Sequence, residues 1–116
     1  LKLLVARDRP EWQQLDELLG AVDHPNCLAQ YDLYHMARQG IDPVAGIERL
    51  AGRIGHVQFA DCPGRGTPGS GGLDFAAALA ALRASGYRGW LGAEYRPGEE
   101  GTRAGLGWLA GWRDSA

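Results

Sequence analysis

The sequence predicts an α/β fold in which parallel strands alternate with helices. Short apolar runs of strand length recur along the 116 residues, and each is followed by a segment whose apolar residues recur at helical spacing. Glycine, proline and aspartate mark the boundaries between these segments. Strands and helices that alternate in this way form parallel sheets through right-handed crossovers. We therefore expect about four strand–helix units in a single domain over residues 1–116.

Local signals place each element in turn. The expected strands cover residues 1–6, 27–35, 56–61 and 89–95, and the expected helices cover residues 10–22, 42–53, 74–86 and 102–112. Pro10 stands near the start of the first helix, and Asp42 and Pro43 supply the N-cap and first turn of the second. Asp74 opens the third helix and Gly86 closes it.

Composition excludes several classes of function. The formal net charge is −2 and no block of Lys or Arg occurs, so the chain lacks the basic surface that nucleic acid or an anionic membrane requires. Its longest apolar runs are shorter than the ~20 residues of a membrane span, and its beginning lacks the features of a signal peptide. We expect a cytoplasmic protein that binds a small polar substrate or another protein.

Polar residues fall on one face of the expected strands. Because side chains alternate along a strand, Asp32 shares its face with Gln30 and Tyr34. Gln58 and Glu94 take corresponding positions in later strands. These positions lie near the C-terminal ends of the strands, where parallel α/β folds bind ligands. On spacing alone two interpretations stand: a ligand site, or polar strand ends that are hydrogen-bonded to neighbouring loops.

The ligand interpretation points to a particular kind of ion. Asp32, Gln58 and Glu94 offer oxygen donors, which suit a hard divalent ion such as Mg²⁺ or Mn²⁺. The sequence has no cluster of cysteine and histidine at the spacing of a structural zinc site. The more specific of the two interpretations is therefore a metal site with oxygen ligands.

Four stretches of the chain resemble a known family. They are "QYDLYHM" (30–36), "RIGHVQFADCPGRGTPGSG" (53–71), "GYRGWLGAEYRP" (86–97) and "GLGWL" (105–109). In their order and in their residues they resemble the C-terminal half of hydroxypyruvate isomerase, a member of the xylose isomerase-like TIM-barrel superfamily. The resemblance implies that the expected units form the C-terminal half of a (β/α) barrel.

This resemblance implies roles for five residues. Asp32, Gln58 and Glu94 match the last three side chains that hold the family's divalent metal ion. Glu94 also matches one of two glutamates that serve as base and acid, while His35 and Arg65 match positions that contact substrate oxygens. The implied reaction converts hydroxypyruvate to tartronate semialdehyde through an enediolate, with the ion holding both substrate oxygens. A guanidinium suits the carboxylate of such a hydroxy-carbonyl acid.

The chain also departs from the family. Ala6 stands where the family's fifth strand ends in a glutamate that is both metal ligand and catalytic partner, and in another register of residues 1–12 the nearest carboxylate is Glu11. Gly66, Thr67 and Gly72 stand where the loop usually carries a histidine–glutamate pair and a further glutamate. Two functions therefore stand: a truncated or degenerate metal-dependent isomerase whose isolated chain is weak or inactive, and a non-catalytic half-barrel that acts only by self-association or by pairing with another half.

The exposed strand edges of a half-barrel predict that it associates with another copy of itself. Four parallel strands leave two edges whose backbone groups lack partners, so we expect a homo-oligomer in which these edges pair. Five aromatic residues are expected to anchor the core between helices and sheet: Phe59, Phe75, Trp90, Trp108 and Trp112.

Overall fold

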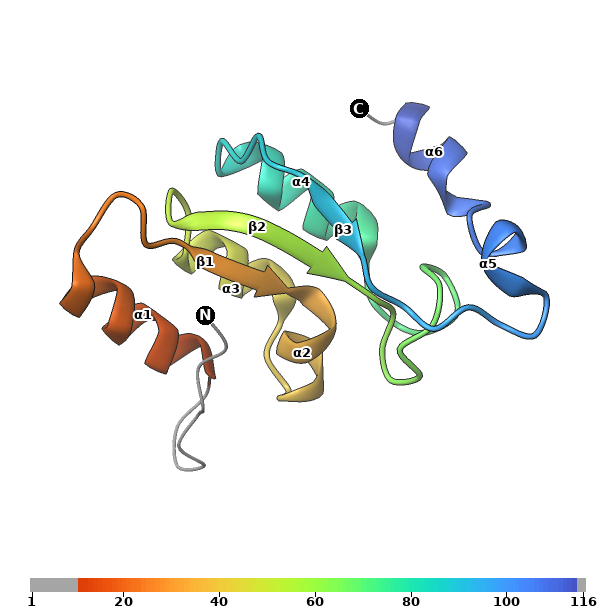
Figure 1. Cartoon of the computed structure of the whole chain (residues 1–116), viewed down its shortest axis with the longest axis horizontal. Helices are drawn as coiled ribbons and strands as arrows, with labels where there is room; N and C mark the ends of the chain where they lie inside the picture. The colour runs from red at the N-terminus through yellow and green to blue at the C-terminus, as the bar shows by residue number, and fades with distance from the viewer. Residues whose placement is uncertain (1–10, 115–116) are drawn as a thin grey trace.

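Three parallel strands form the centre of the part of the chain that the structure describes (Figure 1). The structure is a computed structural model, and it describes residues 11–114. Within these residues, β1 (Ala29–Asp32), β2 (Ile54–Phe59) and β3 (Leu91–Ala93) lie in the order β1-β2-β3, with β1 and β3 as the edges of an open sheet. The α/β class predicted from the sequence is confirmed, while the strand expected over residues 1–6 lies outside the described residues.

Helices follow the strands along the chain. They are α1 (Glu11–Val22), α2 (Leu33–Arg38), α3 (Pro43–Arg49), α4 (Phe75–Ala84), α5 (Gly101–Ala104) and α6 (Trp108–Asp114). The two predicted aspartate caps are confirmed, because Asp42 accepts from the Val44 amide at 3.1 Å and Asp74 from the Ala77 amide at 2.9 Å. Within residues 11–114, no helix is both long and apolar enough to cross a lipid bilayer.

The strand predicted over residues 27–35 is wrong at its end. The chain leaves the sheet after Asp32, whose side chain accepts a hydrogen bond from the His35 amide at 3.1 Å and caps α2. Tyr34 consequently belongs to a helix, so its predicted place on the strand face beside Asp32 is wrong. The helix predicted over residues 102–112 likewise divides into α5 and α6 around Gly105 and Gly107, since glycine is a poor residue for a continuous helix.

One face of the sheet is covered by α3 and α4 and forms the core (Figure 1). Tyr31, Val57 and Phe59 point to this side and are 1% exposed or less. The ring of Phe59 contacts those of Phe75, Trp108 and Trp112, at centroid separations of 4.8–6.0 Å. Four of the five predicted aromatic anchors therefore pack in or against the core. Trp90 is the exception, because it is 85% exposed just before β3.

Helix α1 is tied to the β1 side of the sheet by one apolar and one charged contact. Leu19 is buried in the core, and Leu15 packs against it. The Arg53 guanidinium pairs with the Asp16 carboxylate, which joins α1 to the turn before β2. The face opposite α3 and α4 carries the polar residues of β1 and β2, and it is on this open face that the predicted site lies.

Candidate functional site

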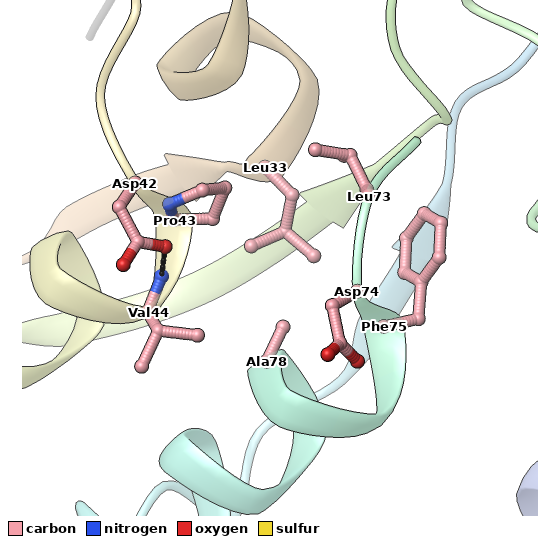
Figure 2. A pocket seen from close by; sticks show the side chains of 8 residues that line it. All are labelled: Leu33, Asp42, Pro43, Val44, Leu73, Asp74, Phe75 and Ala78. Carbon is pink, nitrogen blue, oxygen red and sulfur yellow. Dashed lines mark hydrogen bonds between the residues drawn. The ribbon is translucent and has the colours of Figure 1, made fainter. Parts of the chain in front are cut away.

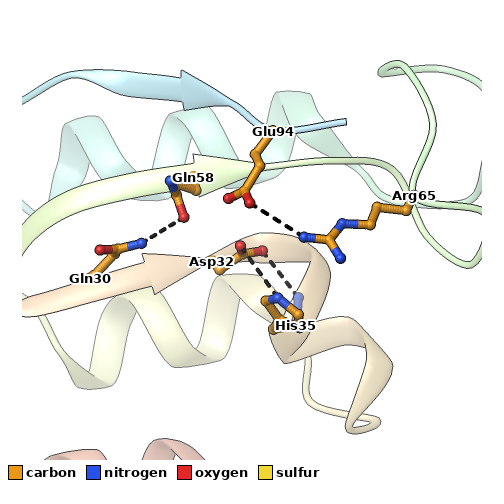
Figure 3. A network of polar contacts seen from close by, with 6 residues as sticks. All are labelled: Gln30, Asp32, His35, Gln58, Arg65 and Glu94. Carbon is orange, nitrogen blue, oxygen red and sulfur yellow. Dashed lines mark hydrogen bonds and ion pairs between the residues drawn. The ribbon is translucent and has the colours of Figure 1, made fainter. Parts of the chain in front are cut away.

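Three strands bring Asp32, Gln58 and Glu94 together on the open face. Asp32 ends β1, and its Cα pairs with that of Gln58 in β2. Gln58 in turn pairs with Gly92 of β3, two residues before Glu94, so all three side chains leave the sheet on the same side. The Glu94 amide donates to the Phe59 carbonyl at 2.9 Å, which extends the ladder past β3. Figure 3 shows the three side chains pointing into a common space at the C-terminal ends of the strands.

Gln30 orients the amide of Gln58. Its side-chain nitrogen donates to Gln58 Oε1 at 2.6 Å across neighbouring strands (Figure 3). In this orientation the Gln58 carbonyl oxygen keeps a second lone pair for another partner. Sequence reasoning placed Gln30 on this face but gave it no role; the signal was its position two residues before Asp32.

Arg65 reaches the site from the loop after β2. Its guanidinium lies 3.4 Å from Glu94 Oε1 and 5.2 Å from the centre of the Tyr34 ring. The ion pair is half open to water, since the Arg65 side chain is 29% exposed and that of Glu94 is 50% exposed. Tyr34 was not expected to meet Arg65, because its place on α2 became visible only with the early end of β1.

His35 stands at the edge of the same group. Its Nε2 lies 3.8 Å from Asp32 Oδ2, and its ring meets that of Tyr34 edge-on at a centroid separation of 5.2 Å. The His35 side chain is 51% exposed, whereas that of Asp32 is 15% exposed. The structure thus brings all five predicted site residues to one end of the sheet, with His35 as the most open of them.

The donor chemistry of this group fits a hard divalent ion. Asp32 and Glu94 supply carboxylates and Gln58 an amide oxygen, all from neighbouring strands on one face. Among residues 11–114 no three His, Cys, Asp or Glu side chains gather as a ligand group. The predicted set contains two carboxylates, those of Asp32 and Glu94. Its third member is the Gln58 amide, which is not one of these four residue types.

Asp61 is the polar residue that sequence reasoning missed. It is 1% exposed and is the buried charged residue of the described core. Its carboxylate accepts hydrogen bonds at 2.8–3.1 Å from four backbone amides, those of Cys62, Gly69, Gly71 and Leu73. An aspartate followed by a glycine-rich loop was the available signal, but the sequence does not show which amides turn toward the carboxylate.

Two cavities lie away from the polar group. One of about 40 Å³ sits where α3 and α4 begin, on the helix-covered side, and Leu33, Pro43 and Phe75 are among its lining residues (Figure 2). The other, of about 290 Å³, lies near the N-terminal ends of the strands and is lined in part by Leu28 and Tyr87. The first has room for little more than a water molecule, and the second is at the end of the sheet opposite the polar group.

A comparison with known families fits this geometry. The family described as "Xylose isomerase-like TIM barrel" matches residues 6–112. The chain belongs to this family, and its open parallel sheet is a fragment of the barrel. Within the family, the predicted kinship with hydroxypyruvate isomerases is confirmed by the relatives that match.

Two curated relatives and one solved structure illustrate the likeness. The hydroxypyruvate isomerase of Escherichia coli is 38% identical over 101 residues, which cover 87% of this chain and 39% of that protein. The 2-oxo-tetronate isomerase of Pectobacterium atrosepticum is 34% identical, over 97% of this chain and 44% of that protein. A crystal structure titled AP endonuclease, family 2, from Brucella melitensis aligns with a TM-score of 0.80 and 37% identity, over 87% of this chain and 39% of that one. The chain thus spans less than half the length of these relatives.

Proposed function

We propose that this chain carries the metal-binding part of an isomerase of the hydroxypyruvate isomerase type. The observation that supports this proposal most is the convergence of Asp32, Gln58 and Glu94 on the open face of the sheet. The substrate is hydroxypyruvate or a similar small hydroxy-carbonyl acid, a class that includes the substrates named for two relatives. Mg²⁺ or Mn²⁺ is the ion that this oxygen donor set suits.

Each residue of the group has a chemical task in this proposal. Asp32, Gln58 and Glu94 would hold the ion, which when bound supplies a Lewis acid for the two substrate oxygens. The reaction shifts one proton from the hydroxymethyl carbon to the neighbouring carbonyl carbon and one proton between the two oxygens, so no atom is gained or lost. Glu94 takes or returns the carbon-bound proton, because its carboxylate is exposed beside the site.

Arg65 and His35 orient the substrate. The Arg65 guanidinium, already beside a carboxylate at 3.4 Å, has the donor geometry to bind the carboxylate of the acid. His35 offers an exposed imidazole next to Asp32 and can donate to a substrate hydroxyl. Because Ala6 occupies the sequence position of the second glutamate, we expect the isolated chain to turn over hydroxypyruvate weakly or not at all.

Metal binding tests the proposal directly. Calorimetric titration with Mn²⁺ is expected to show binding to the parent chain and a loss of affinity of at least about tenfold in Glu94→Ala. Glu99→Ala is the matched control, since Glu99 is an exposed carboxylate five residues further along the chain. Equal affinity for Mn²⁺ in the parent and in Glu94→Ala would contradict the proposed site.

A second candidate function rests on a different observation. Trp90 is 85% exposed and Leu91 is 38% exposed beside the β3 edge of the open sheet. Exposed apolar side chains beside a strand edge that has no partner strand among residues 11–114 favour a non-catalytic half-barrel that self-associates, most simply as a dimer. Light scattering across a dilution series distinguishes the two oligomeric states, and a monomer at micromolar concentration would contradict this candidate.

A further inference from the structure

The loop over residues 61–73 is built around a single carboxylate. Asp61 is 1% exposed, and both of its oxygens accept hydrogen bonds from backbone amides of the loop. A buried carboxylate is costly unless charge-assisted hydrogen bonds of this kind surround it. The Asp61 amide also donates to the Gly66 carbonyl at 2.9 Å, which closes the first turn of the loop. The loop is thus tied to Asp61 at both its near and far ends.

This loop presents Arg65 to the open face. The backbone of Arg65 has a φ of 57°, a left-handed conformation that a non-glycine residue adopts only when its surroundings hold it there. Its carbonyl accepts from the Arg96 amide at 2.8 Å, which joins the loop to the segment after β3. From this backbone position the side chain reaches Glu94 and the ring of Tyr34.

We propose that Asp61 is a positioning residue, which holds the loop over residues 61–73 in the one shape that places Arg65 beside Glu94. The inference rests on the proposed function, in which Arg65 binds the substrate carboxylate. An arginine that is already fixed loses less conformational freedom when the acid binds, so the affinity for substrate depends on the loop as well as on the guanidinium.

Two neighbouring glycines provide a matched pair of variants. A Cβ added at Gly71 would overlap the Cys62 carbonyl oxygen and lie 2.7 Å from Asp61 Oδ1. A Cβ added at Gly72 meets its nearest atom only at 4.0 Å. Neither glycine has a positive φ, so the two alanine substitutions differ in steric overlap with the amides and carboxylate that Asp61 brings together.

The first readout is proteolysis of the loop. Trypsin cleaves after arginine, and we compare the rate of cleavage after Arg65 with the rate after the exposed Arg88 in the same molecule. Cleavage after Arg65 is expected to rise about tenfold or more in Gly71→Ala and in Asp61→Asn, because loss of the amide contacts frees the loop. Gly72→Ala is expected to behave like the parent chain. Unchanged cleavage in both Gly71→Ala and Asp61→Asn would overturn the inference.

The second readout is calorimetric binding of hydroxypyruvate in the presence of Mn²⁺. Gly71→Ala is expected to weaken it by about the same factor as Arg65→Ala, while Mn²⁺ affinity stays at the parent value. A loss of Mn²⁺ affinity would reveal general disruption and overturn a positioning role, as would weakened hydroxypyruvate binding in Arg65→Ala alone. If Arg65→Ala binds hydroxypyruvate like the parent, the proposed substrate contact fails, and the tryptic readout alone then decides whether Asp61 positions the loop.

Discussion

Gln58 and Phe59 are neighbours in β2, yet their side chains lie on opposite faces of the sheet. Phe59 is 1% exposed and packs among the rings of Phe75, Trp108 and Trp112. Gln58 lies half-buried on the other face, and its partner there is the side chain of Gln30. Alternation along one strand therefore separates a face that packs from a face that presents polar groups.

The difference between the two faces indicates where stability and chemistry reside. The helix-covered face removes large apolar side chains from water, which is the dominant stabilising contribution to folding. The open face carries Asp32, Gln58 and Glu94, whose exposed ion pairs and hydrogen bonds contribute little to stability. Substitutions on the two faces should therefore have effects of different kinds.

Truncating Phe59 should have the largest effect on stability. Phe59→Ala removes a buried ring from an aromatic cluster, and the expected loss is about 3–5 kcal/mol in the free energy of unfolding. Urea denaturation followed by circular dichroism measures it. Leu91→Ala is the control, because Leu91 pairs with Val57 and so lies on the same face of the sheet as Phe59. Leu91 is 38% exposed, and its truncation should cost about 1 kcal/mol or less. Equal losses for the two variants would show that the helix-covered face does not hold the core.

The helix-covered face was the more predictable of the two. Alternating apolar residues predicted β2, and Asp42 and Asp74 predicted the starts of α3 and α4, because capping is a local interaction between residues two or three positions apart. The end of β1 was wrong because Asp32 serves both the sheet and the cap of α2. A pattern of alternation alone does not indicate which of these two roles ends the strand.

The site was predictable in its strands and not in its loop. Residues that share strand parity, such as Asp32 and Gln58, follow from the two-residue period of a strand and from parallel pairing. Arg65 was found only through the resemblance, since its meeting with Tyr34 depends on the shape of a long loop. Asp61 was missed because its four amide partners are spread over twelve residues of chain, and no periodic pattern marks them.

Tyr31, on the helix-covered face, should make a smaller contribution to stability, and this contribution should depend on pH. Burial, with a contribution from the nearby Asp42 carboxylate, raises the pKa of Tyr31 above its usual value of about 10. Above pH 10 the unfolded chain therefore loses this proton more readily than the folded chain, and stability should fall as the pH rises toward the folded-state pKa. Its hydroxyl also donates to the Pro43 carbonyl at 2.7 Å.

Tyr31→Phe separates these two contributions. At neutral pH the variant should lose about 1 kcal/mol in the free energy of unfolding, because the hydrogen bond to Pro43 is removed. Between about pH 10 and 11 the stability of the variant should fall less steeply than that of the parent, because the buried hydroxyl no longer ionises. Denaturation curves at a series of pH values test both, and parallel pH dependences in the two proteins would contradict the assignment.

Removing a helix cap should lower the free energy of unfolding only slightly. Asp74→Ala removes the acceptor for the Ala77 amide at the start of α4, and the expected cost is about 1 kcal/mol. Asp74→Asn keeps a capping oxygen and should recover most of the loss. Thermal unfolding of the three proteins measures the difference, which should be absent if α4 is held by its apolar face alone.

Gln58→Leu tests the separation of the two faces most directly. Leucine keeps roughly the size of glutamine but has no oxygen, so without metal its free energy of unfolding should lie within about 0.5 kcal/mol of the parent value. With saturating Mn²⁺ the parent should gain stability through binding, and the variant should gain clearly less, because one of the three proposed ligands is missing. Urea unfolding of both proteins, with and without Mn²⁺, gives all four values. A large loss of stability without metal, or an equal gain with it, would contradict the account.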